Sequence, residues 1–421
     1  MNPQRRRWLG ASMAGTALGW LPHARSQDRP RIGRVVVVGA GFGGAAVAKY
    51  IRLWEPGIEV TLVERNAQFI SCPMSNLVLA GTRTMAELTQ PLDSLARHGV
   101  RLLQAEATEV DLDKKQVRLR GASPLAYDRL VLAPGVDFQF EKIPGLADAD
   151  RRGRVLHAWK AGPQTTELRA RLEALPNGAV FAICVPRAPF RCPPGPYERA
   201  CLVAHYFKQH KPRSKVVVLD ANPEPVSKKA LFLDAWKTLY PGLVEYRPRA
   251  ELRGFDGARN MARLAAGNFK ADLFNVIPPQ EAGRIALPLI NVNSQWVGVD
   301  FRTWESMEAP GVHVIGDAIA PAPGMPKSAF MANNQAKLVA DAVIALMTGQ
   351  PVNPQPILAN TCYSFVSPTQ AMHVASVHKW SDDQRTLMPV PGAGGLSPGP
   401  NELEGNYAWL WAQNIWADTL G

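Results

Sequence analysis

The sequence has few cysteines and no long hydrophobic run. Its 421 residues include five cysteines, none in a Cys-x-x-Cys pair, which argues against a disulfide-stapled scaffold and against a cysteine zinc site, so no metal is expected. No apolar stretch approaches the ~20 residues of a membrane-spanning helix, and stable membrane insertion is not expected. The sequence contains no basic run with interleaved aromatic residues, which is the pattern that would indicate a nucleic-acid partner. With 46% hydrophobic and 20% charged residues, the chain is predicted to be globular, with two or three domains.

The first 26 residues have the three parts of an export signal. Arg5 to Arg7 precede a short apolar stretch, Ala11 to Leu21, and the small residues of Ala24 to Ser26 fit a cleavage site. Paired arginines indicate the twin-arginine route, so the mature chain is expected to start near Gln27 in the bacterial periplasm. The leader contains four arginines, Arg5, Arg6, Arg7 and Arg25. Without them, 43 of the 47 Lys and Arg residues remain against 36 Asp and Glu residues. This modest surplus suits an anionic substrate or an acidic protein partner as well as DNA, so nucleic acid is the weaker interpretation.

A strand, a tight turn and a helix are predicted directly after the leader. The β-branched run Arg34 to Val38 leads into the letters GAGFGG, and Ala45 to Trp54 has helical composition. In this arrangement Gly39 permits the turn, Gly41 lets the backbone approach a pyrophosphate, and Gly44 allows close packing of helix on strand. The pattern predicts a dinucleotide-binding fold with the phosphates at the helix N-terminus.

Three later segments extend this pattern, and the resemblance of the last two to a flavoprotein family implies that the dinucleotide is FAD. A second strand, Glu59 to Val63, ends at Glu64, where a carboxylate can bind the adenosine ribose. The strands Tyr127 to Gly135 and Gly311 to Ala318 resemble the later motifs of flavoproteins of the glutathione reductase type. That resemblance implies that Asp317 binds the ribityl chain.

The same superfamily resemblance implies an α/β fold with two Rossmann-like domains, the second inserted in the first. The FAD-binding domain is expected to consist of residues 33–145 and 284–350, and residues 146–283 to form the inserted domain. A C-terminal α+β domain is expected at residues 351–421.

The inserted domain lacks a second glycine fingerprint. Its first strand, Ala179 to Val185, is followed by the letters PRAPFRCPPGPYER, in which prolines replace the glycines. Proline removes backbone donors and the conformational freedom that a phosphate cradle needs. The strand Lys215 to Asp220 indicates that the scaffold is kept. Reduced nicotinamide is therefore not expected to be a substrate.

The five cysteines differ in their local sequence. Cys184 lies in an apolar strand and Cys201 in a predicted helix, so both are interpreted as core residues. Cys192 follows a parallel strand, where ligand-facing groups lie, and Cys72 follows the ribose-binding carboxylate. No local pattern links Cys362 to Cys192, and on composition alone either could be a buried structural thiol. An oxidising periplasm favours a disulfide, but these residues alone do not identify the pair.

Six motifs taken together are more selective than any one of them. GAGFGG, SCPMSN, RCPPGPYERA, NVIPPQ, VIGDA followed by MPKSAFMANNQAK, and NTCYSFVSP resemble the flavoprotein subunit of flavocytochrome c sulfide dehydrogenase, over essentially the whole mature chain. The resemblance implies that Cys72 carries FAD covalently through its 8α-methyl group. It also implies that Cys192 and Cys362 form a redox-active disulfide facing the flavin, and it assigns no role to Cys184 or Cys201. The expected activity is that of a sulfide:cytochrome c oxidoreductase.

The resemblance also implies a partner, a c-type cytochrome subunit. This chain has no Cys-x-x-Cys-His motif, so haem is expected on the partner only. Residues 351–421 are then expected to cover the flavin and to contact the cytochrome.

Two further residues are candidates for the site. Glu198, six positions after Cys192, is a candidate proton acceptor, although a surface glutamate is an equally good interpretation. Lys327 precedes a helix predicted over Ser328 to Val339 and is a candidate for placing positive charge near the reduced flavin. Its alternative is an ordinary capping or solvated lysine.

Three alternative functions remain at this stage. A sulfide:quinone reductase would need an apolar membrane-facing surface, and the tail from Asn406 to Leu420 forms only a partial apolar stripe that includes Trp409, Trp411 and Asp418. An NADH-dependent disulfide or peroxide reductase conflicts with the proline-rich loop. An accessory redox flavoprotein of a sulfur-oxidising complex is the third alternative.

Overall fold

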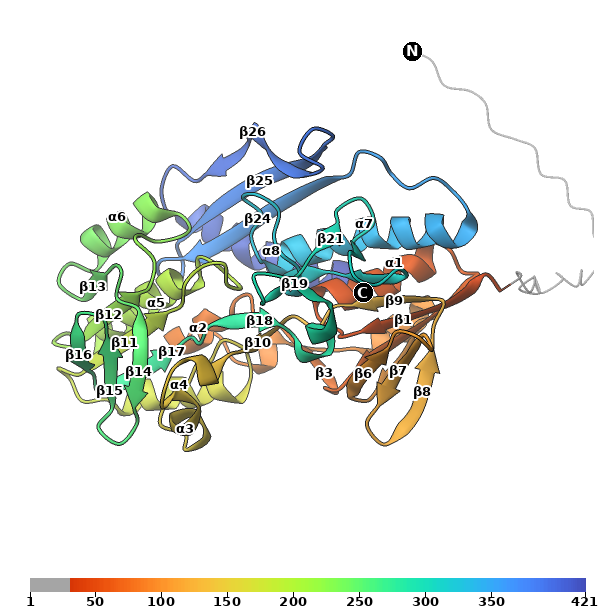
Figure 1. Ribbon diagram of the computed structural model, residues 1–421. Helices are drawn as coiled ribbons and strands as arrows, with labels where there is room; N and C mark the ends of the chain where they lie inside the picture. The colour runs from red at the N-terminus through yellow and green to blue at the C-terminus, as the bar shows by residue number, and fades with distance from the viewer. Residues whose placement is uncertain (1–30) are drawn as a thin grey trace, which may run out of the picture. The chain divides into compact units, whose positions relative to one another are not determined.

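The larger of two parallel sheets contains strands from distant parts of the chain. The computed structural model describes residues 31–421 (Figure 1), and the export signal predicted at residues 1–26 lies outside the described residues. The sheet order is β21 (Val299–Asp300), β22 (Glu305–Ser306), β23 (Val312–Val314), β9 (Arg129–Leu132), β1 (Gly33–Val38), β2 (Ile58–Glu64) and β5 (Arg101–Gln104). The strands from β23 to β5 are parallel, and the register aligns Val38 with Val63 and with Leu132. Their carboxyl ends therefore form one edge, where α/β folds bind ligands.

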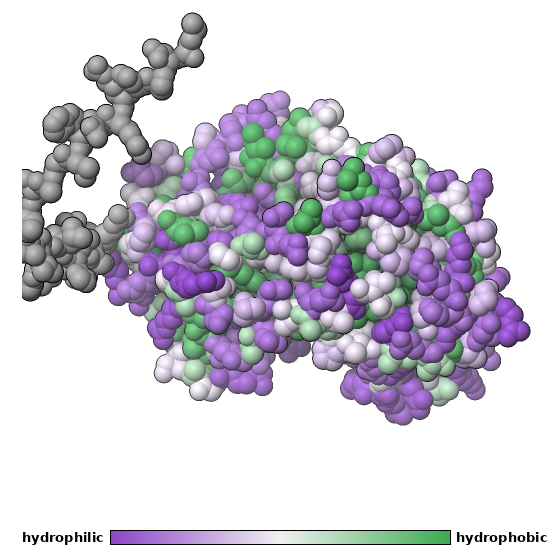
Figure 2. Space-filling view, turned by 180° about the vertical axis from the view of Figure 1, so that it is seen from behind, coloured by the Kyte–Doolittle hydropathy of each residue, from purple (hydrophilic) through white to green (hydrophobic). Residues whose placement is uncertain are grey.

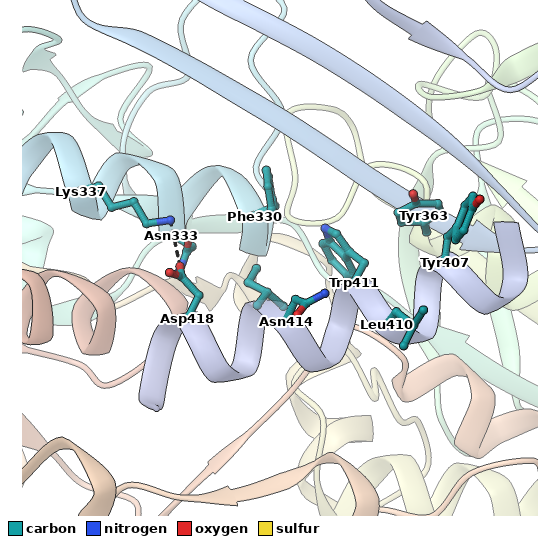
Figure 3. Close-up of a pocket in the computed structure, with 10 residues that line it drawn as sticks. Phe330, Asn333, Lys337, Tyr363, Tyr407, Leu410, Trp411, Asn414 and Asp418 are labelled. Carbon is teal, nitrogen blue, oxygen red and sulfur yellow. Dashed lines mark ion pairs between the residues drawn. The ribbon is translucent and has the colours of Figure 1, made fainter. Parts of the chain in front are cut away.

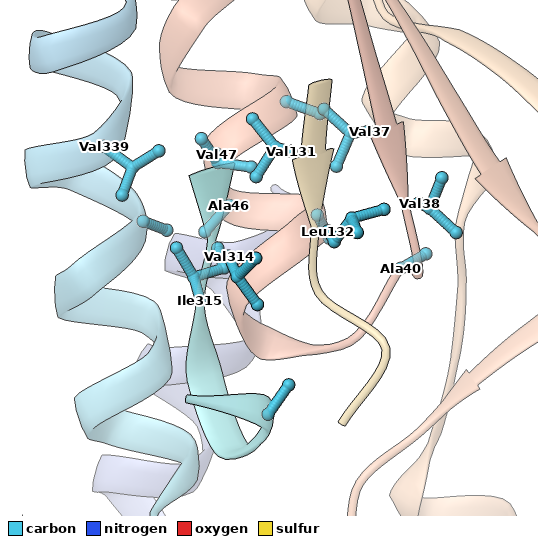
Figure 4. Packing of buried hydrophobic residues seen from close by; sticks show 14 of the residues in the cluster. Val37, Val38, Ala40, Ala46, Val47, Val131, Leu132, Val314, Ile315 and Val339 are labelled. Carbon is cyan, nitrogen blue, oxygen red and sulfur yellow. The ribbon is translucent and has the colours of Figure 1, made fainter. Parts of the chain in front are cut away.

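Two helices cover one face of this sheet. Figure 4 shows Val47 of α1 (Phe42–Trp54) and Val339 of α7 (Ala329–Thr348) beside Val131 and Val314 of the strands. The strands carry nearly continuous valine and leucine runs because both faces of a parallel sheet are buried. On the other side in Figure 1 lies an antiparallel meander of β6 (Ala107–Asp111), β7 (Gln116–Leu119) and β8 (Ala122–Ala126).

The second parallel sheet has the order of half a Rossmann fold. Its four strands are β13 (Val244–Arg247), β12 (Lys215–Asp220), β11 (Val180–Val185) and β17 (Leu273–Val276). The helices of this region are α3 (Leu146–Arg151), α4 (Pro163–Ala174), α5 (Gly195–His210) and α6 (Lys229–Leu239), and a meander follows of β14 (Leu252–Asp256), β15 (Met261–Leu264) and β16 (Gly267–Lys270). The predicted α/β fold class is confirmed by these two sheets.

The C-terminal region packs on the first domain. An antiparallel sheet of β24 (Ile357–Phe365), β25 (Ala371–Ser381) and β26 (Thr386–Leu396) is followed by α8 (Glu402–Leu420). Lys49 of α1 donates hydrogen bonds to the carbonyls of Asp418 (2.8 Å) and Gly421 (2.6 Å), where a cation stabilises the C-terminus of a helix. Among residues 31–421 no helix is long and apolar enough to cross a membrane.

Short elements complete the framework between the sheets. They are β3 (Gln68–Ile70) paired with β4 (Thr89–Pro91), α2 (Ser75–Ala80), β10 (Val136–Phe138) paired with β18 (Gln280–Ala282), and β19 (Ile290–Val292) paired with β20 (Trp296–Val297). The ribbon of β10 and β18 lies where the chain passes between the two parallel sheets (Figure 1). The turn between β3 and α2 and the turn before α5 both reach the cavity described next.

Candidate functional site

A cavity of about 1230 Å³ opens at the carboxyl ends of the strands of the larger sheet. It exceeds the ~300–1,000 Å³ of ordinary small-molecule pockets, as a site for a dinucleotide must. Residues from the larger sheet, from the loop after β11 and the start of α5, and from the C-terminal region line it. They lie mainly within 38–43, 63–76, 133–142, 191–199, 281–287, 315–317, 327–332, 361–363 and at Trp411. Every predicted site residue except Gly44 lies on its wall.

The three glycines of the fingerprint occupy three different environments. Gly39 has a φ of 95°, in the left-handed region that favours glycine. A Cβ on Gly44 would lie 1.8 Å from the carbonyl oxygen of Gly39, so only glycine allows α1 to pack this closely on the turn. A Cβ on Gly41 would meet no atom within 4 Å and would instead point into free space beside the cavity. Local packing therefore does not require glycine at position 41, and its open face leaves room for the backbone to approach a ligand.

Glu64 lies at the end of β2, beside this turn. Its Oε2 accepts a hydrogen bond from the backbone N–H of Ala40 (2.8 Å), and its Oε1 accepts one from the N–H of Asn66 (2.8 Å). These bonds fix the carboxylate at the rim of the cavity, where it can also accept from ribose hydroxyls.

Asp317 supplies the test of whether FAD fits this cavity. Its Oδ1 is buried and has no hydrogen-bond partner among residues 31–421, and burial raises the pKa of this carboxyl. Buried polar atoms are almost always paired, so this oxygen indicates a donor that the chain does not supply. A ribityl hydroxyl is such a donor. Together with the open face of Gly41, this residue fits the dinucleotide.

Cys72 lies in the turn between β3 and α2 and lines the same cavity. Its carbonyl accepts hydrogen bonds from both the backbone N–H (3.1 Å) and the hydroxyl (2.6 Å) of Ser75. The residue after Pro73, Met74, has a φ of 73°, so the turn is tightly held. A rigid turn of this kind can hold a thiol at a fixed point on a bound ligand.

Cys192 and Cys362 both line the cavity, one from the loop before α5 and one from β24. All five cysteines in residues 31–421 are free thiols in this structure. Burial raises the pKa of Cys192, and the nearby Cys362 raises it further. Cys192 itself has a φ of 57° and donates its N–H to the carbonyl of Lys327 (2.9 Å). The structure thus brings together the two cysteines for which a disulfide is predicted.

Glu198 connects three elements around these cysteines. Its Oε1 accepts from the N–H of Phe365 at the end of β24 (2.8 Å), and its Oε2 accepts from Nδ2 of Asn76 in α2 (2.8 Å). Burial raises the pKa of Glu198, although these hydrogen bonds oppose the effect. A carboxyl with a raised pKa holds a proton more readily than an exposed one and can exchange it with neighbouring groups.

Lys327 is buried, and its ammonium is already engaged. It donates to the carbonyls of Asp317 (2.8 Å) and Ile319 (2.5 Å) and lies 3.6 Å from the ring centroid of Trp296. Burial lowers the pKa of Lys327 to about 7, with Asp317 opposing the shift. The lysine therefore holds the turn that carries Asp317, and its charge near the cavity varies around neutral pH.

The carboxylate at the end of the second sheet is occupied by side chains of the protein itself. Asp220 holds at the end of β12 the position that Glu64 holds at the end of β2. Its Oδ2 accepts from the hydroxyls of Tyr197 (2.8 Å) and Tyr246 (2.9 Å), and its Oδ1 from the N–H of Asn222 (2.9 Å). This carboxylate is fully buried and has no free face for a ligand. Its place in the strand could have identified it from the sequence, but its tyrosine partners could not have been found that way.

Two further residues near the cysteines and the cavity have no role predicted from the sequence. Trp411 of α8 lines the cavity, and its Nε1 is buried without a partner among the described residues. Lys228 donates from Nζ to the carbonyl of Cys362 (2.9 Å) and to Oγ of Ser364 (2.8 Å). No local pattern marks Lys228, because its partners come from a strand 134 and 136 positions away.

A second, smaller hollow lies between α7 and α8 (Figure 3). Its wall includes exposed residues of α8, Tyr407 and Leu410, and an ion pair between Lys337 and Asp418 (2.9 Å). Three aromatic residues, Phe330, Tyr363 and Trp411, line both this hollow and the large cavity. The ring centroids of Phe330 and Tyr363 each lie 6.0 Å from that of Trp411.

Three family models each match a part of the chain. Residues 165–278 match the central part of the sulfide dehydrogenase [flavocytochrome c] flavoprotein chain, and residues 354–420 match the flavin-binding part of flavocytochrome c sulphide dehydrogenase. Residues 33–168 match the pyridine nucleotide-disulphide oxidoreductases. A flavoprotein chain of sulfide dehydrogenase from Chlorobaculum thiosulfatiphilum is 62% identical over 45 residues, which are 94% of that sequence and 11% of this one. The chain belongs to the family of flavocytochrome c sulfide dehydrogenase flavoprotein chains.

Sulfide:quinone oxidoreductases also resemble this chain. The mitochondrial sulfide:quinone oxidoreductase of Mus musculus is 22% identical over 300 residues, which span 67% of this chain and 65% of the mouse protein. The sulfide:quinone oxidoreductase of Aquifex aeolicus superposes with a TM-score of 0.75 over 92% of this chain and 91% of its own, at 18% identity. At that identity the likeness establishes the fold alone. The predicted family resemblance is confirmed by the models and the Chlorobaculum relative.

Proposed function

We propose that this chain oxidises sulfide through a bond between Cys192 and Cys362, carries FAD covalently on Cys72, and passes electrons to a c-type cytochrome subunit in the periplasm. The observation that carries the proposal is the cavity itself. Its wall includes the three cysteines, Glu198 and the unpaired oxygen of Asp317.

The sulfur chemistry balances with the groups present. Hydrosulfide attacks one sulfur of the bond between the cysteines, forming a persulfide there and releasing the other cysteine as a thiolate. The sulfide sulfur is oxidised by two electrons, and the bond between the cysteines is reduced. Glu198 is close enough to Cys192 for its charge to raise the pKa of that thiol, and it is our candidate for taking the persulfide proton. FAD, when bound, supplies a two-electron acceptor that can release electrons singly.

The position of α8 supports a protein acceptor. Trp411 and its two aromatic neighbours lie between the cavity and the outer hollow, so an acceptor that docks on α8 would approach the cavity closely. Hydrophobic residues on the face shown in Figure 2 lie in groups separated by polar ones and not in one continuous band.

A sulfide:quinone reductase is the second candidate function. Its support is the likeness to the mouse and Aquifex proteins, which bear that name. Purified holoprotein should be given sulfide with either a c-type cytochrome or a soluble quinone. We expect reduction of the cytochrome and little of the quinone, and the reverse preference would favour the second candidate. A purely accessory role would show neither.

The cysteines are tested by serine variants. Cys192→Ser and Cys362→Ser should each stay folded and keep the flavin, which dithionite should still reduce. Sulfide-driven loss of flavin absorbance should fall by about 100-fold or more, because a persulfide can no longer form with release of a thiolate. Near wild-type rates in either variant would end the proposal for this pair. Loss of fold or flavin in both would favour a structural bridge.

A further inference from the structure

Lys228 lies beside the cysteines in a position that is unfavourable for a lysine in three ways. It is only 4% exposed, although burial of an ammonium is costly and lowers its pKa. Its φ of 51° and ψ of 36° are left-handed, a conformation that non-glycine residues seldom adopt. It also immediately precedes α6, where the positive end of the helix dipole disfavours a cation. A strained conformation of this kind persists only where the surrounding structure fixes it, and such residues are frequent at functional sites.

Helix capping does not explain the residue. The position before α6 favours Ser, Thr, Asp or Asn, whose side chains accept a hydrogen bond, and lysine has no acceptor. The two acceptors of its Nζ, the carbonyl of Cys362 and the hydroxyl of Ser364, are uncharged. Those two contacts satisfy two of the three donors of its ammonium but supply no opposite charge.

The charged neighbours of Lys228 explain the buried lysine better than helix capping does. The titratable groups whose charges favour its ammonium form are Cys362 on β24, Glu198 and Cys192 at α5, and Glu404 on α8, with Cys362 the strongest. In return, Lys228 is the main group that opposes the effect of burial on the pKa of Cys362. The pKa of Cys192 is lowered more by Arg191 than by Lys228.

We propose that Lys228 is a positioning residue that holds negative charge on Cys362 when the bond between Cys192 and Cys362 opens. The inference rests on the proposed function. It gives that reaction a direction: hydrosulfide attacks Sγ of Cys192, the bond between the cysteines breaks, and its electron pair goes to Sγ of Cys362. The products are a persulfide on Cys192 and a thiolate on Cys362, so atoms and charge balance.

The first test measures thiolate formation in the reduced holoprotein. Iodoacetamide alkylation of each cysteine is followed by peptide mass spectrometry as a function of pH. In the wild type, Cys362 should react at lower pH than Cys192. In Lys228→Gln, which keeps a hydrogen-bond donor but loses the charge, alkylation of Cys362 near neutral pH should fall about 10-fold, one unit of pKa. Lys228→Arg should restore it.

The neighbouring lysine provides a matched control. Lys229 is exposed and pairs with Glu224 (2.6 Å), so Lys229→Gln should leave both cysteines unchanged. Earlier ionisation of Cys192 than of Cys362 in the wild type would overturn the proposal, and this comparison needs no variant to fold. A wild-type alkylation profile in Lys228→Gln would overturn it as well.

The second test locates the added sulfur. After brief exposure to sulfide, the mass increase of one sulfur should appear on Cys192 in the wild type. In Lys228→Gln the sulfide-driven step should slow by about 10-fold while dithionite reduction is unchanged. If the proposed function fails, neither cysteine gains sulfur in any protein, yet the alkylation profile still reports on Lys228. A persulfide on Cys362 in the wild type would overturn the proposed direction of attack.

Discussion

Cys72 is held by Ser75 at a fixed point on the cavity wall, which makes its predicted bond to FAD directly testable. A thioether survives acid denaturation, so the flavin of the wild type should remain with the precipitated chain. Cys72→Ser should release free FAD into the supernatant, measured by its visible absorbance. Cys184→Ser, on a buried strand, is the control and should retain the flavin. Colour that stays on the Cys72→Ser precipitate would place the link elsewhere.

His157 should make the protein sensitive to acid. Its Nδ1 accepts the N–H of Trp159 (2.9 Å), its ring lies 4.4 Å from that of Phe138, and burial lowers its pKa to about 3. Between pH 6.5 and about pH 3, His157 binds a proton in the unfolded chain but not in the folded chain. The free energy of unfolding therefore falls as pH falls, by about 2 kcal/mol at pH 5 from this residue alone.

His157→Asn keeps an acceptor at the Nδ1 position but cannot be protonated. The difference between its urea midpoints at pH 7 and pH 5 should be smaller than that of the wild type. His210→Asn, at the exposed end of α5, should behave as the wild type does. An unchanged pH dependence in His157→Asn would contradict the prediction.

At the scale of single elements, the glycine turn separates packing from ligand binding. Gly44→Ala forces a Cβ against the carbonyl of Gly39 and should lower the free energy of unfolding by more than about 2 kcal/mol. Gly41→Ala meets no atom and has an ordinary φ of −75°, so stability should change by less than about 0.5 kcal/mol. In a Cys72→Ser background, Gly41→Ala should nevertheless bind FAD more weakly, measured by fluorescence titration. Equal FAD affinity would remove Gly41 from the cradle.

The loop between β11 and α5 should exclude nicotinamide. It offers prolines in place of glycines, and Asp220 is occupied by two tyrosines. Micromolar NADH should neither bleach the flavin of the holoprotein nor quench its fluorescence in the absence of sulfide. Asp220→Asn should not change this result, because the carboxylate does not face a ligand site. Rapid bleaching by NADH would overturn this interpretation of the second sheet.

The elements show which features a local pattern can predict. The strand predicted at Lys215 to Asp220 is β12 to the residue, because a buried parallel strand is a continuous apolar run. The helix predicted to end at Val339 continues to Thr348, since its end is set by Gly349 in a left-handed conformation. Cys192 could be placed near a ligand from its strand. Lys228 could not, because its position is set by contacts with β24, far along the chain.

At the scale of the whole molecule, export and assembly are open to test. Cleavage near Gln27 should be seen by N-terminal sequencing of periplasmic protein, and Lys-Lys in place of Arg5 and Arg6 should block export. An intact leader on the periplasmic protein, or unchanged export of the variant, would contradict the proposed route.

The outer hollow beside α8 gives the last prediction. Leu410 lies on its wall and is 54% exposed, and Trp411 behind it reaches the cavity. Leu410→Glu should disturb docking of a cytochrome without touching the sulfur chemistry. We expect sulfide-driven cytochrome reduction to fall about 10-fold at low cytochrome concentration, the effect of about 1.4 kcal/mol at a docking surface. Sulfide-driven loss of flavin absorbance should be unchanged.

The control for this variant is another exposed hydrophobic residue. Met307 is 72% exposed and follows β22, so Met307→Glu adds the same charge at a position that does not line the hollow. It should leave both rates unchanged. If the two variants slow cytochrome reduction equally, the effect is one of net charge, and the acceptor does not dock on α8. If Leu410→Glu slows sulfide-driven flavin reduction instead, the substitution acts on the cavity and not on docking. Electron transfer to an acceptor on α8 would then lose its support.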